Sequence, residues 1–216
     1  MAITYPRSLP ACGARRVALE LFDPVVSAAS KRGLVINRTQ VVDPLWRLRA
    51  ETHMLRQPAE WIAWGASLGG GLRTFLASDS RYRQPLAYPN AGVPGDVAAG
   101  WDGTADVTAL GSGGALSLAL LPSSYQITAG DRIGLEQGSP LRRGYYMALE
   151  DVTASAGGVA TVTVTPFLHT AIFTAAATAR LWRPSAEFVL DPSTWPENPG
   201  ALPRWSSFSF EAWQTI

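Results

Sequence analysis

The sequence predicts a mainly β fold, a β-rich α+β protein with one short helix. Apolar and polar side chains alternate with period two along much of the chain, for example at residues 159–165, a pattern typical of half-buried strands. Helical spacing of apolar residues is confined to residues 61–68. Strand-like segments lie near both chain ends, which favours a base β-domain containing both ends, with a small β-barrel or sandwich inserted between them.

Three strands are predicted before the helix. Residues 16–22 alternate, with their apolar side chains on one face, and Pro24 is expected to end this strand. Residues 35–42 form the second strand. Residues 45–55 form the third, which has Trp46 and other apolar side chains on one face and charged side chains on the other.

The predicted helix at residues 61–68 follows Pro58, a residue that suits the first turn of a helix. Trp61, Trp64 and Leu68 then recur at helical spacing and make one apolar face. We expect this face to pack on the sheet of the base domain.

Three consecutive glycines end the helix, and residues 72–76 predict the next strand. A glycine-rich stretch then opens the inserted unit, which we assign to residues 91–183. The base domain is residues 1–90 together with residues 184–216. The strands of the inserted unit are predicted at residues 116–121, 132–135, 145–152, 159–165 and 179–182.

The end of the chain predicts a returning strand at residues 188–190, an irregular proline-rich arm at 191–203 and a last strand at 205–213. The last strand has apolar groups on both faces, which an edge strand of a lone sheet seldom keeps. Tryptophan and arginine are enriched at protein interfaces. The aromatic residues expected to contact neighbouring subunits are Trp195, Trp205, Phe208, Phe210, Trp213 and Trp101.

Two blocks of sequence carry a family resemblance. Residues 57–89, QPAEWIAWGASLGGGLRTFLASDSRYRQPLAYP, combine a helix, a glycine turn, a strand, Asp79 and a Pro-Leu-Ala-Tyr-Pro tail. Residues 127–166 contain ITAGDRIGL, YYMALEDV and VATVTVTP in that order. In order and spacing these pieces resemble distal tail or minor tail proteins, which are tail-tip components of long-tailed bacteriophages.

The resemblance implies a structural role without catalytic residues or a cofactor. Such proteins form a ring that joins the tail tube to the host-binding hub, and tails of this type have six-fold symmetry. The implied partners are further copies of the same chain, the tail tube protein and the tail hub proteins. The implied location is the tail tip of the virion, after synthesis in the host cytoplasm.

Composition excludes several other classes. The net charge of +1 gives no electrostatic footprint for nucleic acid or an anionic membrane. No apolar run is long enough to cross a bilayer, and the N-terminus lacks the pattern of a signal peptide. Charged residues make up only 16% of the chain, which indicates surfaces buried in an assembly. The lone Cys12 allows no internal disulfide.

Neither a metal site nor an enzyme is predicted. The chain has two histidines, and they lack the spacing of a zinc motif. A glycosidase needs two carboxylates that face one cleft. Glu150 and Asp151 are adjacent and would point to opposite faces of a strand, while Asp131, with Glu136 beyond it, follows Gly130 in a turn that leads into a strand.

A carbohydrate-binding module at the tail tip is the alternative function. It would use the inserted unit, with Trp101 and either Tyr145 or Tyr146 exposed on one face. Burial of the same residues against another chain would instead favour the ring.

Overall fold

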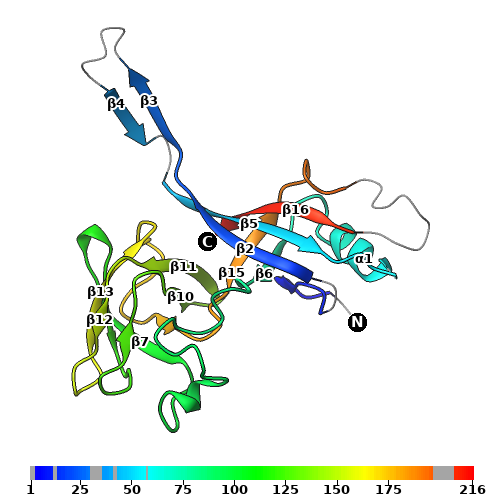
Figure 1. The fold of residues 1–216 in the computed structure, drawn as a ribbon. Helices are drawn as coiled ribbons and strands as arrows, with labels where there is room; N and C mark the ends of the chain where they lie inside the picture. The colour runs from blue at the N-terminus through cyan, green and yellow to red at the C-terminus, as the bar shows by residue number, and fades with distance from the viewer. Residues whose placement is uncertain (1–2, 12–13, 30–35, 41–42, 57, 197–206) are drawn as a thin grey trace.

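A computed structural model describes residues 3–11, 14–29, 36–40, 43–56, 58–196 and 207–216 (Figure 1). Strands account for 42% of the structure and helix for 8%, with one α-helix, and six of the strands close into a barrel. The predicted β-rich fold with one short helix and a small β-unit is therefore confirmed, and the β-unit is a barrel instead of a sandwich.

Six strands form the base sheet, in the order β1-β6-β15-β16-β5-β2. Their bounds are Arg7–Ser8 (β1), Ala14–Phe22 (β2), Leu45–Thr52 (β5), Thr74–Ala77 (β6), Ala186–Leu190 (β15) and Ser209–Thr215 (β16). β1 is parallel to β6, and every other neighbouring pair is antiparallel. Because β15 and β16 lie between β6 and β5, segments from both ends of the chain build one sheet.

The helix α1 (Ala59–Ser67) packs on the inner face of this sheet, as predicted. Trp61 and Trp64 are buried there. The Trp64 ring lies 5.0 Å from Phe75 of β6, and the Trp61 ring lies 6.0 Å from Phe208, just before β16. The Trp64 indole N–H donates to the carbonyl of Ser8, so its polar edge is also satisfied inside the core.

The turn after α1 is longer than the sequence indicates. Gly69, Gly70 and Gly71 all have positive φ angles, of 59°, 66° and 93°, and only glycine adopts this region without strain. Leu72 is consequently left exposed in the turn. β6 begins at Thr74, so the prediction of a strand that starts at residue 72 is wrong.

The barrel has the strand order β10-β11-β13-β8-β7-β14 and closes because β14 pairs with both β10 and β7. Its strands are Thr104–Leu110 (β7), Ala115–Ala119 (β8), Arg132–Gln137 (β10), Arg142–Ala148 (β11), Ala160–Thr165 (β13) and Thr178–Arg180 (β14). Two short strands, Gln126–Ile127 (β9) and Val152–Thr153 (β12), pair beside the barrel. The 3₁₀ turns Pro94–Asp96 (η1) and Ser112–Gly114 (η2) precede β7 and β8.

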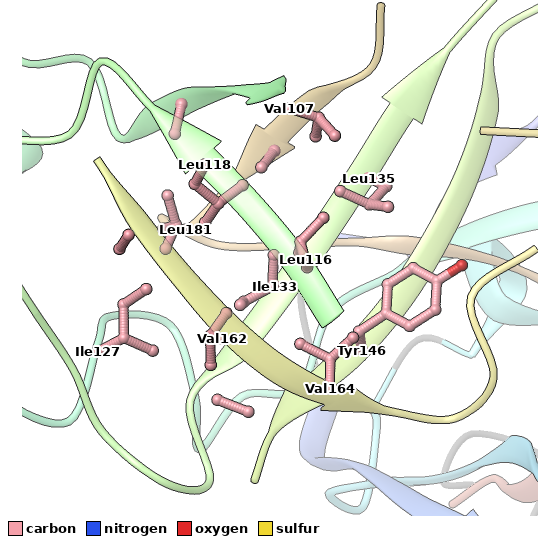
Figure 2. Packing of buried hydrophobic residues seen from close by; sticks show 14 of the residues in the cluster. Val107, Leu116, Leu118, Ile127, Ile133, Leu135, Tyr146, Val162, Val164 and Leu181 are labelled. Carbon is pink, nitrogen blue, oxygen red and sulfur yellow. The ribbon is translucent and has the colours of Figure 1, made fainter. Parts of the chain in front are cut away.

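The barrel interior is filled by alternate side chains of its strands (Figure 2). Leu116, Leu118, Val162 and Val164 point inward from β8 and β13, and these side chains are buried. This period-two pattern is the one that the sequence displays at residues 159–165. Closure leaves the barrel without the unpaired edges that an open sheet exposes.

The barrel and the base sheet share a buried contact. Tyr145 of β11 belongs to the core of the base sheet, and its backbone carbonyl accepts the indole N–H of Trp46 at 2.7 Å. The two rings meet edge to face at 5.2 Å. The Arg132 guanidinium lies over both Trp46 and Tyr82, 4.8 Å and 4.3 Å from the ring centres. Strands of residues 104–180 build the barrel, while the independent folding of residues 91–183 stays a prediction.

One hairpin stands away from both units (Figure 1). It consists of Val25–Ala29 (β3) and Ile36–Gln40 (β4), which pair only with each other. The sequence predicts the second of these strands but not the first, because Pro24 is expected to end the preceding strand. Pro24 instead lies between β2 and β3, where the chain leaves the base sheet. We call residues 23–40 the hairpin arm.

Candidate assembly surface

The structure corrects the interface assignment of Phe208 and Phe210. Their side chains are only 1% and 2% exposed, and they pack against Trp61 and Trp64 in the core of the base sheet. β16 pairs with β15 on one side and β5 on the other, so it is an interior strand and not an edge strand. Alternation in such a strand places Phe210 and Ala212 under the helix, so the burial of this set needs no partner chain.

Trp195 packs on its own chain as well. Its ring lies 5.3 Å from Phe210 and covers Gly65 of α1. The preceding residues fold back onto β16, since the Thr194 hydroxyl accepts the N–H of Glu211 at 2.9 Å. This first part of the proline-rich arm therefore does not reach outward. The rest of that arm, and Trp205, lie outside the described residues.

Gly65→Ala is expected to lower the free energy of unfolding by about 1–3 kcal/mol, the range for overpacking. A Cβ at this position would overlap the Trp195 ring, and that steric cost exceeds the gain in helix propensity of about 1 kcal/mol. Thermal unfolding would measure the difference. In a Trp195→Ala background, the same substitution should be neutral or stabilising. A loss of similar size in both backgrounds would show that Trp195 does not constrain this position.

Trp101 is half-buried at the end of the barrel. Its indole N–H donates to the carbonyl of Thr104 at 2.7 Å, and its ring meets Tyr125 at 5.0 Å. Tyr145 and Tyr146 are buried. The three aromatic residues therefore do not form the exposed platform that the carbohydrate-binding alternative requires.

Among the predicted interface residues that the structure describes, Trp213 alone lies on the outer face of the base sheet. Its ring meets Phe22 edge to face at 5.4 Å, and the Arg47 guanidinium lies 5.9 Å from its centre. Phe22 is 41% exposed and ends β2 directly before the hairpin arm. The outer face thus carries a partly exposed aromatic pair beside the base of the arm.

The arm continues this apolar surface. Val25 and Val26 are 47% and 59% exposed, and consecutive residues of a strand point to opposite faces. Apolar side chains therefore face solvent on both sides of the arm. We call Phe22, Val25, Val26 and Trp213 the arm-base patch. Sequence reasoning missed its valines, although two short apolar runs around Lys31-Arg32-Gly33 are a recognisable hairpin signal.

Ion pairs cover the outer face next to the patch. Arg47 and Arg49 both contact Glu20 and Glu211, at N–O distances between 2.9 and 3.8 Å. These side chains are partly exposed, so each pair contributes little to stability. These ion pairs balance the positive and negative charges on the outer face around Phe22 and Trp213.

The four carboxylates that were weighed as glycosidase residues all form hydrogen bonds or ion pairs within the fold. Buried Asp131 accepts the backbone N–H groups of Leu86 and Thr128 at 2.7 and 2.8 Å. Burial raises the pKa of Asp131 above its ordinary value, although these two hydrogen bonds oppose the rise. Glu136 pairs with Arg143 and Arg180, both at 3.2 Å.

Glu150 and Asp151 are also engaged. Glu150 accepts the N–H and the hydroxyl of Thr163, and Asp151 accepts the N–H of Ala129. Each of the four carboxylates thus fixes a local turn or strand contact. In the part of the chain that the structure describes, no three His, Cys, Asp or Glu side chains are grouped as metal ligands would be.

Comparison with known proteins identifies no relative. No protein-family model matches the chain, and no curated protein is significantly similar to it. Within the described ranges, no helix combines the length and the apolar character needed to cross a membrane.

Proposed function

We propose that this chain is a structural subunit of a phage tail tip or baseplate, where copies form a ring that joins the tail tube to the host-binding hub. The resemblance of residues 57–89 and 127–166 to distal tail proteins supplies the identity. The single structural observation that carries the proposal is the hairpin arm, which projects from the body with apolar side chains on both faces (Figure 1).

A projecting hairpin of this kind is a poor structure for a lone subunit. Two strands without a covered face are marginally stable in water. Burial of Val25 and Val26 against another subunit would stabilise the assembly by up to about 1.5–3 kcal/mol for each fully covered side chain. The arm-base patch therefore supports a contact in which a second copy covers the arm.

A head-to-tail contact fits this asymmetric arrangement. An arm that binds a different surface of the next copy repeats until the assembly closes as a ring or extends as a filament. The arm carries Lys31, Arg32 and Arg38 against a single acidic residue, Asp23, at its base. The surface that receives it should be acidic, and the exposed carboxylates of Asp96 and Asp102 on the barrel have that character.

The resemblance supplies three further parts of the proposal. They are the six-fold symmetry, the tail tube and hub proteins as partners, and the location at the virion tail tip. The carbohydrate-binding alternative loses its motivating observation, because Tyr145 and Tyr146 are buried. The proposed partners are proteins, with neither nucleic acid nor a membrane among them.

Val26→Asp is expected to prevent self-assembly, because it puts a charge where the contact should bury a methyl group. Native mass spectrometry and sedimentation would follow the mass, which is 23.1 kDa for one chain. The wild-type chain should form a closed oligomer, with a hexamer expected, and the variant should remain a folded monomer with the circular dichroism spectrum of the wild type.

Leu72→Asp provides the matched control, since Leu72 is 89% exposed in the turn after α1, outside both the arm and the barrel. This variant should assemble like the wild type. A wild-type chain that stays at 23.1 kDa at every concentration, or a Val26→Asp variant that assembles normally, would contradict the proposal.

A further inference from the structure

A hollow on the barrel surface surrounds a single acidic side chain. It has a volume of about 400 Å³ and is lined by Asp106, Val107 and Thr108 of β7 and by residues 175–178, which reach into β14. Ala105 and Val107 are buried inside the barrel, so Asp106, which lies between them, points outward. Asp106 pairs with Thr178 of β14 and with Ala119 of β8. Its carboxylate therefore stands on the outer wall of the barrel, in the hollow.

A β-bulge in β7 shapes this hollow. The register of β7 against β8 shifts between Val107 and Ala109, which leaves Thr108 without a partner on β8. Bulges re-aim side chains and are common at the rims of barrels. The Thr108 hydroxyl donates to the carbonyl of Ser117 at 3.2 Å, so its oxygen can still accept a hydrogen bond. The hollow thus offers a carboxylate and a hydroxyl oxygen to an incoming donor.

Asp106 differs from the other carboxylates of its unit. Residues 84–180 contain seven acidic side chains, and all except Asp106 have partners in the fold. The six with partners are Asp96, Asp102, Asp131, Glu136, Glu150 and Asp151. Within the described residues, the Asp106 carboxylate has neither a hydrogen bond nor an ion pair.

The barrel supplies no cation for Asp106. Residues 84–131 and 144–179 contain no lysine or arginine. The arginine nearest along β14 is Arg180, two residues beyond Thr178, and it contacts Glu136 at 3.2 Å. No ion pair joins Arg180 to Asp106 within the described residues. A cationic partner for Asp106 must therefore come from outside the barrel.

We infer that this hollow receives a basic side chain from the hairpin arm of a second copy. The inference rests on the proposed assembly through the arm, and it names the surface that receives the arm. The arm of the same chain stands far from β7 (Figure 1), so the arm that binds belongs to another copy. Its charge comes from Lys31, Arg32 and Arg38. A guanidinium can donate two charge-assisted hydrogen bonds to one carboxylate.

Apolar groups around the hollow match the arm as well. Ala175 and Ala176 line it and can cover the aliphatic stem of a basic side chain. Leu120, which follows Ala119 at the end of β8, is 69% exposed. The arm likewise combines exposed valines with positive charge. A bare divalent metal ion fits this hollow poorly, because a single carboxylate lines it and such ions take several oxygen ligands.

Fluorescence anisotropy with a labelled arm peptide tests the inference on the full chain. The probe is residues 23–40, closed into a ring by a disulfide between added terminal cysteines. A matched peptide carries glutamate in place of Lys31, Arg32 and Arg38. The receptor is the Val26→Asp variant, which leaves the hollow unchanged and removes competition from assembly. It should bind the basic peptide and not the glutamate peptide, and added salt should weaken the binding.

Substitution of Asp106 locates the site. Asp106→Asn should weaken binding of the basic peptide about tenfold, because it removes the charge and keeps the shape. Asp106→Arg should abolish this binding and allow the glutamate peptide to bind instead. Both variants should keep the circular dichroism spectrum of the wild type, since Asp106 is exposed. Glu51→Arg is the control, as Glu51 is an exposed residue of β5 outside the hollow, and its affinity should stay within about twofold.

Three results would overturn the inference. One is failure of the basic peptide to bind. Another is equal binding of the basic and glutamate peptides. The third is unchanged affinity in both Asp106 variants. The outcome for the ring is read separately, from the mass of the wild-type chain. A chain that stays at 23.1 kDa but binds the peptide through Asp106 would contradict the ring alone, whereas normal assembly with unchanged Asp106 variants would contradict the hollow alone.

Discussion

Replacement of Trp61 by alanine is expected to lower the free energy of unfolding by about 3–5 kcal/mol, the range for large aromatic side chains in a core. The Trp61 side chain is 1% exposed. Its ring lies 5.7 Å from Trp64, 6.0 Å from Phe208 and 6.3 Å from Phe210. Alanine would leave a cavity beneath the helix that rigid neighbouring rings cannot fill.

Chemical denaturation with a fluorescence or circular dichroism signal would measure this loss. Ile62→Ala is the control on the same helix, since Ile62 is 47% exposed and points away from the sheet. It should change stability by no more than about 0.5 kcal/mol, as surface substitutions do. Equal losses of unfolding free energy for the two variants would contradict the assignment of Trp61 to the core.

Removal of the Asp79 carboxylate is expected to have the second largest effect. Asp79 is fully buried and accepts the N–H of Leu19 in β2 at 2.9 Å. It also accepts the backbone N–H of Arg81 and two bonds from the Arg81 guanidinium. These contacts join the segment after β6 to β2, the end strand of the base sheet.

Asp79→Ala should lower the free energy of unfolding by about 2–3 kcal/mol, because it leaves the Leu19 N–H without its acceptor and removes charge-assisted bonds. The Arg81 side chain is 44% exposed, so its charge can be hydrated after the loss. For this reason the expected cost is below that of a fully buried broken pair. Asp79→Asn should cost less, as it retains one acceptor oxygen.

The pH dependence of stability provides a sharper test of Asp79. Burial raises the pKa of its carboxyl, but the hydrogen bonds from Arg81 and Leu19 outweigh this effect and hold the pKa below the ordinary value of 3.8. A lowered folded-state pKa gives stability that is present above pH 3.8 and is lost as the pH falls through the folded-state pKa. Asp79→Asn should therefore lose less stability on acidification than the wild type.

The contribution of Asp131 to stability should change with pH in the opposite direction. Its pKa is raised above 3.8, so its contribution to stability is present below that pH and is lost as the pH rises through the folded-state pKa. Asp131→Asn should then lose more stability than the wild type on acidification. Melting temperatures across the acidic range would compare the two variants. Parallel curves for the wild type and Asp79→Asn would refute the role given to Asp79.

The sequence by itself determined the local structure of this protein. Helical spacing of Trp61, Trp64 and Leu68 predicted the face of α1 that is buried, and strict alternation predicted the inward set of β13. Both patterns report which side of an element avoids water, and this depends on residues close together in the chain. The β-rich class followed from the frequency of such alternation.

Only the tertiary structure decided which elements are neighbours. It placed β16 inside the sheet, which buried Phe208 and Phe210, and it brought Tyr145 of the barrel into the core of the base sheet. It also set the carboxylate of Asp79 against β2, some 60 residues away along the chain. An alternating strand has the same pattern at an edge and in the interior, because periodicity records the direction of side chains and carries no information on which backbone pairs with it. The hairpin arm and the interface assignments depend on that pairing.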